Sequence, residues 1–226
     1  ENPGHELGCT SQFGTIYGDK FYIVSKQEKD PGATVIGSRL AVIDAKTMKV
    51  LKEFTRIGDS DGRSFLGVDE HTGYIGTSNG IFLYDIDKME IGERITGTEN
   101  TSGSLYSAQI GTMIRVGDRV FAVHQKDGLL VIDAKTHTLE TTILKPEEHE
   151  GHGLGSIVLS KDGTIWASPT VELTGTGASL PLIWKVDPTT LTVQQVDIPT
   201  ASGIEEIPNS WYAWTADGFC ASTKEN

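Results

Sequence analysis

The stretch EEHEGHG at residues 147–153 gathers the side chains best able to do chemistry. It contains two histidines, His149 and His152, among three glutamates. Imidazole nitrogens and carboxylate oxygens are zinc ligands, so the two histidines and one glutamate could hold a metal. The spacing is not that of HExxH, and no helical pattern aligns the side chains. A solvated acidic loop is the favoured interpretation, and a metal site at His149 and His152 is the weaker alternative.

Other catalytic signatures are missing from the sequence. There is no G-x-S-x-G nucleophile elbow, and GTSNG at 76–80 is typical of a hairpin turn. Cys9 and Cys220 lack the spacing of a zinc site and are expected to be small buried apolar residues. No serine, cysteine or carboxylate pair stands out as catalytic, and no cofactor motif is present. We therefore look to the elements that would position a binding site.

The composition excludes several classes of function. The net charge of -12 disfavours binding to DNA, RNA or anionic lipid. No apolar run approaches the roughly 20 residues that a transmembrane helix needs. The chain opens ENPGHELG without a methionine, so we expect a processed or trimmed product whose compartment must be inferred another way.

The hexapeptide VIDAKT occurs twice, at 42–47 and 131–136, and marks an internal repeat. Four segments share its pattern of apolar residues, an aspartate, a short polar stretch and a second alternating run: 39–54, 80–95, 128–143 and 181–196. The alternation predicts two strands joined by a tight turn. The shared aspartates, Asp44, Asp85, Asp133 and Asp187, are expected to accept backbone N–H groups in those turns.

A second hairpin precedes each of these segments. Its first strands are predicted at 11–17, 63–68, 109–116 and 155–160, and its second strands at 21–26, 73–78, 120–125 and 164–169. Each unit thus has four antiparallel strands in about 40 to 54 residues, which is the pattern of a β-propeller blade. We predict an all-β propeller domain over 1–226, with blades near 10–54, 62–95, 104–143 and 154–198.

A partial fifth blade is predicted at 209–226, where the sequence offers two strands. The residues before Ser11 are too few and too polar to supply the other two strands. About four and a half blades are therefore expected, as part of a ring of six to eight blades, most simply seven. We expect the remaining blades on another or a missing segment.

The unit RVFAVHQKDGLLVIDAKTHTLETTI at 119–143 resembles the YVTN-type repeat of surface-layer and YncE-like propellers. The match is fair at 21–54 and 73–95 and weak at 164–198. The stretches GCTSQFGTIYGDKFYIVSKQ, GRSFLGVDEHTGYIGTSNGIFLYDID and NSWYAWTADGFCAS resemble YncE-like propellers of gut Bacteroidetes. A propeller fold hosts many functions, so this likeness does not decide the chemistry.

One branch of those propellers, the BtuG type, captures cobalamin and related corrinoids beside a TonB-dependent outer-membrane transporter. The resemblance thus implies an extracytoplasmic protein, lipid-anchored at the outer-membrane surface or periplasmic. It also implies a small ligand, with a corrinoid as one candidate and such a transporter as a candidate partner. It supplies no residue-level corrinoid motif.

The two faces of the predicted propeller differ in loop length. Turns between first and second and between third and fourth strands are short, and they make one face. The connections between blades are longer, at 55–62, 96–104, 144–153 and 199–209, as are two loops within blades, 26–38 and 169–181. Long loops usually carry binding sites, so we expect the ligand on this long-loop face.

The starts of the innermost strands should ring the channel on that face. The rim candidates there offer donors, acceptors, one guanidinium and aromatic surface: Gln12, Arg63, Ser64, Gln109, His152, Asn209, Trp211 and Tyr212. Such a ring would suit a polar ligand of moderate size, rich in amides or hydroxyls. It could equally hydrate the channel.

Three functions follow from this sequence. The preferred one is a non-catalytic binding propeller. The second is a propeller lyase or hydrolase that uses His152, Arg63 and a carboxylate at the channel mouth. The third is a protein-interaction or surface-layer scaffold without a small ligand.

Overall fold

The computed structural model describes ten stretches of the chain. They are residues 11–28, 35–58, 62–99, 110–145, 153–169, 178–179, 182–197, 207–208, 211–215 and 218–222. Side chains are described within 14–25, 37–58, 62–99, 110–145, 153–169 and 183–196. All regular elements in these stretches are strands, and no helix there is long and apolar enough to cross a membrane.

Four sheets of four antiparallel strands form the body of the protein. Blade 1 consists of β1 (Ser11–Tyr17), β2 (Lys20–Glu28), β3 (Val35–Asp44) and β4 (Val50–Ile57). Blade 2 consists of β5 (Gly62–Gly67), β6 (Thr72–Thr77), β7 (Gly80–Asp85) and β8 (Glu90–Arg94). Blade 3 consists of β9 (Ile110–Val116), β10 (Arg119–His124), β11 (Gly128–Asp133) and β12 (Thr138–Ile143). Blade 4 consists of β13 (Leu154–Leu159), β14 (Ile165–Pro169), β16 (Leu182–Val186) and β17 (Val193–Asp197).

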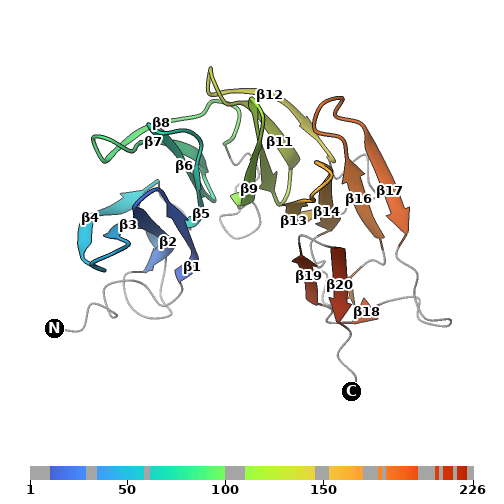
Figure 1. The fold of residues 1–226 in the computed structure, drawn as a ribbon, viewed down its shortest axis with the longest axis horizontal. Helices are drawn as coiled ribbons and strands as arrows, with labels where there is room; N and C mark the ends of the chain where they lie inside the picture. The colour runs from blue at the N-terminus through green and yellow to red at the C-terminus, as the bar shows by residue number, and fades with distance from the viewer. Residues whose placement is uncertain are drawn as a thin grey trace.

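The blades stand side by side in an open arc, with the first strand of each on the concave side (Figure 1). Contacts of β5 with β1, of β9 with β5 and of β13 with β9 line that side. The predicted all-β fold with four-stranded propeller blades is confirmed, and the four sheets do not close a ring. Most strands lie within about two residues of the positions expected from the sequence, as for β5, expected at 63–68 and found at Gly62–Gly67. Blade 1 differs, because β3 begins four residues before the expected segment 39–54 and β4 ends three residues after it.

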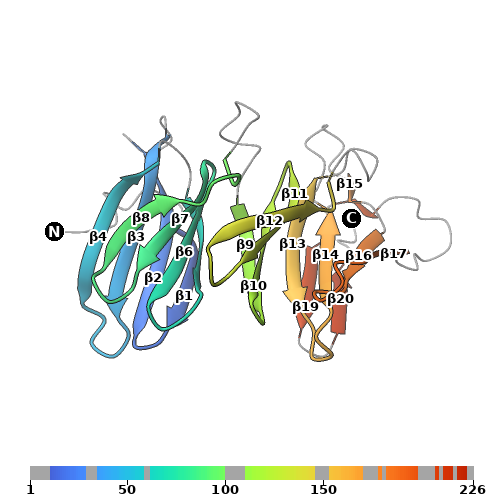
Figure 2. The ribbon, with the colours of Figure 1, turned by 90° about the horizontal axis from the view of Figure 1, so that it is seen from above.

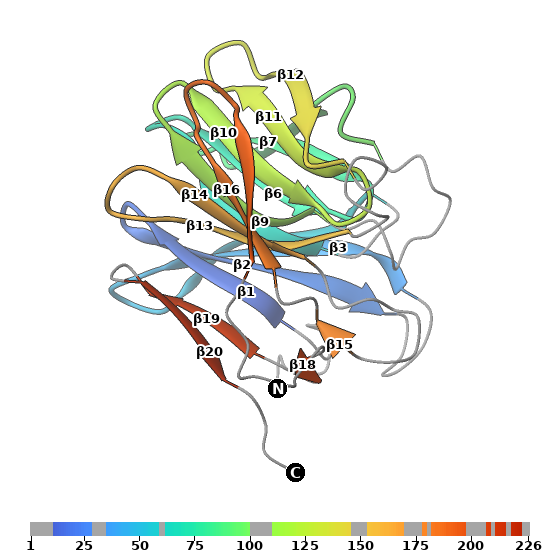
Figure 3. The ribbon, with the colours of Figure 1, turned by 90° about the vertical axis from the view of Figure 1, so that its right-hand side faces the viewer.

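Two shorter sheets complete the described strands. The hairpin of β19 (Trp211–Thr215) and β20 (Gly218–Ser222) lies beyond blade 4 (Figures 1 and 3), within the span predicted for a fifth blade. The pairing of β15 (Ala178–Ser179) with β18 (Ile207–Pro208) was not predicted. It joins the loop inside blade 4 to the loop that follows this blade.

The core lies between the blades, where the facing sheets bury their apolar side chains against one another. One cluster joins blade 1 to blade 2, another blade 2 to blade 3, and a third blade 3 to blade 4. In the first, the ring of Tyr22 stacks on that of Phe65 with centroids 3.9 Å apart. Glycine is required at Gly67 and Gly73, since a Cβ there would collide with the rings of Tyr17 and Phe65.

The aspartate of each repeat caps a tight turn, as predicted. The Oδ1 atom of Asp44 accepts the N–H groups of Lys46 (3.0 Å) and Thr47 (2.6 Å). Asp133 accepts those of Lys135 (2.8 Å) and Thr136 (2.7 Å) in the same way. Asp85 and Asp187 cap the corresponding turns of blades 2 and 4. VIDAKT is therefore a structural motif of these turns, and its first copy, between β3 and β4, lies at the lower edge of Figure 2.

Candidate functional site

Buried polar side chains gather at one end of the blades. The strand order places the ends of second and fourth strands and the starts of first and third strands at the long-loop face. Nine polar or charged side chains are buried in the described residues, and all lie at that end: Ser25, Ser38, Arg39, Ser64, Thr77, Ser78, Thr98, His124 and Ser168. We call these residues the polar layer. The opposite ends of the strands contribute none to this set.

A buried polar group costs free energy unless it is hydrogen-bonded, so this one-sided distribution is informative. At their other ends, the same sheets pack through apolar side chains and end in exposed turns, without buried polar side chains in the described residues. Packing of the blades therefore does not by itself require the polar layer. The polar layer therefore makes the long-loop end of the blades the candidate functional face.

The two threonine hydroxyl groups of the layer hold neighbouring backbone in place. The Thr98 hydroxyl donates to the Ile95 carbonyl (2.7 Å) and accepts the Ile81 N–H (3.0 Å). The Thr77 hydroxyl donates to the Gly80 carbonyl (3.0 Å) and accepts the Asn79 N–H (3.0 Å). These bonds fix the loop bases of blade 2, so the loops above them start from a rigid platform.

Arg39 brings a buried cation to the layer. One guanidinium nitrogen lies 2.7 Å from Oε1 of Glu53, on the neighbouring strand β4. The guanidinium is almost fully buried while the carboxylate is partly exposed. This pairing compensates the buried charge.

His124 is the layer's titratable group. Its Nδ1 accepts the N–H of Asp127 at 3.0 Å, and Oδ2 of Asp127 lies 3.2 Å from the same nitrogen. Nε2 is buried and has no hydrogen-bond partner in the described part of the chain. Burial lowers the pKa of His124, an effect that the Asp127 carboxylate opposes only in part. The ring is thus neutral at pH 7, with its proton on Nε2.

Two of the predicted rim residues have described side chains. Arg63 and Ser64 lie at the start of β5, the inner strand of blade 2. Arg63 is half-buried. The hydroxyl of Ser64 donates to the Ile110 carbonyl at 3.3 Å, which joins the inner strands of blades 2 and 3. Arg63 is therefore the charged rim candidate among the described side chains, whereas Ser64 holds two blades together.

The side chains of the other rim candidates lie outside the described residues. Gln12 lies in β1, and Trp211 and Tyr212 lie in β19, as backbone only. Gln109, His152 and Asn209 fall outside the described residues, as does His149 of the predicted metal site. Within the described stretches, no three His, Cys, Asp or Glu side chains are placed to hold a metal.

Sequence reasoning missed Arg39, Thr77, Thr98 and His124. Aligned by their turn aspartates, Ser25, Thr77, His124 and Pro169 occupy the same position at the end of the second strand. That position carries no large apolar side chain in any of the four blades. The repeat alignment contains this signal, and reading it position by position could have revealed the layer.

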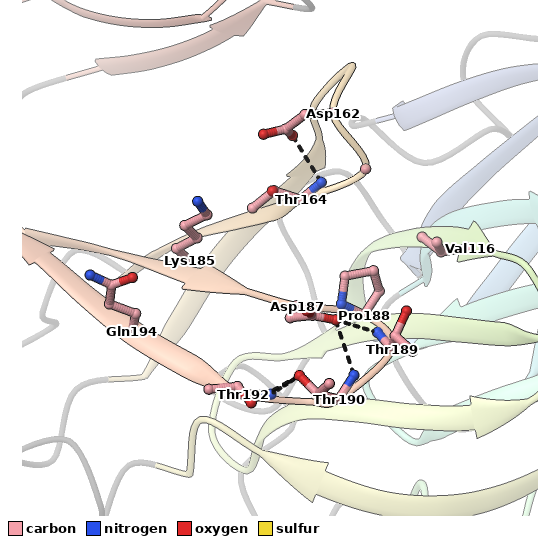
Figure 4. Close-up of a pocket in the computed structure, with 11 residues that line it drawn as sticks. Val116, Asp162, Thr164, Lys185, Asp187, Pro188, Thr189, Thr190, Thr192 and Gln194 are labelled. Carbon is pink, nitrogen blue, oxygen red and sulfur yellow. Dashed lines mark hydrogen bonds between the residues drawn. The ribbon is translucent and has the colours of Figure 1, made fainter.

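A groove of about 640 Å³ lies at the other end of blade 4 (Figure 4). It is lined by turn residues such as Asp162 and Asp187, together with Lys185 and Gln194. The carboxylates are already bonded to backbone N–H groups, Asp162 to Thr164 (3.0 Å) and Asp187 to Thr189 (2.7 Å). This groove is thus lined by groups engaged in turn structure, and we do not consider it the ligand site.

Comparison with known proteins decides the family. The family described as "Domain of unknown function (DUF5074)" matches residues 1–226. The chain belongs to this family. No curated protein matches this DUF5074 chain.

Solved structures resemble the DUF5074 chain in fold. The extracellular domain of the putative one-component system BT4673 from B. thetaiotaomicron is 15% identical, with a TM-score of 0.57. That match covers 94% of this chain and 27% of the BT4673 chain. The computationally designed Ika4 protein is 11% identical over 85% of this chain and 96% of its own, with a TM-score of 0.49. HIRA(644-1017) is 15% identical over 84% of this chain and 56% of its own, with a TM-score of 0.42.

Proposed function

We propose that this protein is a non-catalytic extracytoplasmic binding protein whose long-loop face holds a small polar ligand. The observation that carries the proposal is the polar layer, since every buried polar side chain of the described residues lies at that face. A rigid platform under long loops is the usual construction of a binding surface. The fold likeness to the BT4673 extracellular domain supports a location outside the cytoplasm.

Arg63 is the described residue that we expect to contact the ligand. It lies at the start of an inner strand, half-buried, next to the buried hydroxyl of Ser64. A guanidinium offers five N–H donors in a fixed geometry, which suits carbonyl, carboxylate or phosphate oxygens. The ligand is therefore expected to present such oxygen acceptors.

The finer version of the proposal follows from the YncE-like resemblance. A corrinoid carries several amide side chains and matches this description of the ligand. We propose it as the first ligand to test, with an outer-membrane surface or periplasmic location and a TonB-dependent transporter as partner.

Isothermal titration calorimetry with cyanocobalamin tests the corrinoid version. Binding by the wild type, and binding weakened by about tenfold or more in Arg63→Ala, is the expected result, because a charged hydrogen bond contributes about 1.5–3 kcal/mol. Lys46→Ala is the matched control, since it removes a cation from an exposed turn on the opposite face. Absence of heat with wild-type protein would exclude the corrinoid, and equal weakening in both variants would exclude the long-loop face as its site.

A further inference from the structure

The turn between β10 and β11 is held by a titratable side chain, whereas the matching turn of blade 2 is held by a neutral one. In both turns, the last residue of the second strand accepts the backbone N–H of the residue that precedes the glycine opening the third strand. In blade 2 the hydroxyl of Thr77 accepts the N–H of Asn79 (3.0 Å). In blade 3 the Nδ1 atom of His124 accepts the N–H of Asp127 (3.0 Å). An imidazole thus takes the place of a hydroxyl in an otherwise equivalent contact.

The Nδ1 atom of His124 has two partners within reach and can serve one at a time. In the neutral ring its lone pair accepts the Asp127 N–H. A proton on Nδ1 occupies that lone pair, so this hydrogen bond is lost in the charged ring. Oδ2 of Asp127 already lies 3.2 Å from the same nitrogen and is placed to accept the new N–H. Protonation therefore exchanges a contact with the backbone of Asp127 for a contact with its side chain.

The turn of blade 2 does not offer this exchange. The Thr77 hydroxyl does not titrate near neutral pH, and it also donates to the Gly80 carbonyl (3.0 Å). The residue in the place of Asp127 is Asn79, whose Oδ1 accepts an N–H of Arg94 (3.1 Å). The histidine and the aspartate of blade 3 therefore replace a pair of neutral side chains that hold the same turn without responding to pH.

The ring of His124 is shielded from solvent. Its exposed fraction is 1%, and Ile110 of β9 and Gly128 of β11 lie opposite it. Burial lowers the pKa of the imidazole, Asp127 raises it in part, and Lys126 lowers it. Both charged groups lie in the turn itself, and neither the flanking strands nor blade 2 adds another among the described residues. The ring is therefore neutral at pH 7 and takes up a proton below about pH 6.5.

The β10–β11 turn supports two strand ends at the long-loop face. The carbonyl of Gln125 accepts the N–H of Leu154 (3.1 Å), at the start of β13. Gly128 packs so closely on the end of β12 that a Cβ there would lie 2.6 Å from the carbonyl oxygens of Ile143 and Leu144. Because β13 is the inner strand of blade 4, a change in this turn reaches the inner rim of the long-loop face.

We propose that the β10–β11 turn is a proton-operated switch that sets the position of the start of β13 and lowers the ligand affinity of the long-loop face in mild acid. In the neutral state, His124 holds the Asp127 N–H and the turn holds Leu154. In the charged state, the ring binds the Asp127 carboxylate, and the bond between Gln125 and Leu154 weakens as the turn rearranges. The ligand part of this inference rests on the proposed function, whereas the switch itself does not.

An NMR titration of the 226-residue chain between about pH 7.5 and 5 tests the switch without a ligand. Long-range ¹H–¹⁵N spectra report the tautomer and the protonation of His124, and amide spectra report Asp127 and Leu154. We expect the Nε2–H tautomer at the upper pH and one midpoint, below about pH 6.5, shared by the ring and both amides. The Asn79 amide of blade 2 is the internal control and should not titrate.

Hydrogen exchange gives a second readout of the same bond. The Leu154 N–H should exchange with solvent about tenfold faster or more in the charged state, after correction for the intrinsic pH dependence of exchange.

The matched variant gives blade 3 the neutral pair of blade 2. His124→Thr combined with Asp127→Asn should keep the contact with the backbone N–H but remove its titration, so the Leu154 amide should no longer respond to pH in this range. Asp127→Asn alone removes the acceptor of the charged ring and should move the His124 midpoint to lower pH. The melting temperature of each variant shows that it is folded.

Three results would overturn the switch. The first is protonation of the His124 ring without any change at the Asp127 and Leu154 amides. The second is a pH response of Leu154 that persists in the folded double variant. The third is a His124 ring that stays neutral down to about pH 5.

Calorimetric titration with cyanocobalamin separates the ligand part from the proposed function. The wild type should bind about tenfold more weakly or less tightly still at about pH 5.5 than at about pH 7.5, and the double variant should bind equally at both. Equal wild-type affinity at the two pH values would contradict the effect on the ligand. Absence of binding at both would exclude the corrinoid as the ligand, and the NMR titration would then decide the switch by itself.

Discussion

The hydroxyl of Tyr74 in blade 2 lies 2.9 Å from Nδ1 of His137, which stands in the capped turn of blade 3. Burial raises the pKa of Tyr74, so its hydroxyl stays protonated and hydrogen-bonds to the imidazole as a neutral group. The same turn type in blade 4 accepts from Arg119 of blade 3, through the carbonyls of Pro188 (3.1 Å) and Thr189 (3.0 Å). The short-turn face therefore joins blades to one another through its capped turns.

Loss of the Tyr74 hydroxyl should destabilise the protein. Tyr74→Phe removes the hydrogen bond to His137 but keeps the ring, so the free energy of unfolding should fall by about 0.5–1.5 kcal/mol in urea titrations. Tyr84→Phe is the control, because the Tyr84 hydroxyl is buried without a hydrogen-bond partner in the described stretches. That change should be neutral or stabilising. An equal loss in both variants would contradict the role of the interblade bond.

Replacing Met48 with glycine should stabilise the protein. Met48, Met89, His137 and Leu191 occupy one position in the four capped turns, with φ of 56°, 52°, 56° and 60°. An L-residue other than glycine is strained in this left-handed region. Met48 is exposed, so its side chain can be removed without loss of packing. Met48→Gly should raise the free energy of unfolding by up to about 1 kcal/mol, which is the relieved strain less the cost of the greater freedom of glycine in the unfolded chain.

Calorimetric melting of Met48→Gly against wild type measures this gain. His137→Gly is the informative comparison, because it relieves the same backbone strain but loses the contact with Tyr74. A gain of the same size in His137→Gly would show that this contact adds no stability.

Stability should fall in acid as the turn aspartates protonate. Backbone hydrogen bonds, from Thr136 first, lower the pKa of Asp133, and bonds from Thr47 and Thr190 lower those of Asp44 and Asp187. A lowered folded-state pKa contributes stability above the unfolded value near 3.8 that is lost as the pH falls through the folded pKa. The melting temperature of Asp133→Asn should therefore fall less steeply with pH than that of the wild type between about pH 4 and pH 2. An unchanged acid slope would argue against the capping account.

His124 should make the stability depend on pH in a second, higher range. Burial lowers its pKa, so the folded protein resists protonation that the unfolded chain accepts below about pH 6.5. Stability attributable to this group is present above that pH and declines as the pH falls below it. His124→Thr copies the residue at the matching position of blade 2, Thr77, and should flatten the melting temperature between about pH 6.5 and 5. If the variant keeps the wild-type slope in this window, His124 is not buried as a neutral ring.

The sequence predicts the blades better than the site. Short apolar runs bounded by turn residues predict strands such as β10 and β11, which are buried almost throughout. The repeated aspartate fixes the position of each turn, so the four sheets follow from local pattern. The pairing of β15 with β18 escapes prediction, because two-residue strands have no periodicity. The polar layer could not be predicted from the sequence for another reason. Thr77 or Ser168 in a strand looks like a solvent-facing residue in the sequence, yet both are buried in the fold.

The most direct test of the long-loop face is a crystallographic fragment screen of the 226-residue chain with small amides and polyols. The account predicts that bound fragments gather at the long-loop face, with several in contact with Arg63 or with residues beside the polar layer. Fragments that gather instead in the groove lined by Asp162, Lys185 and Asp187 would place the binding surface on the short-turn face and contradict the account.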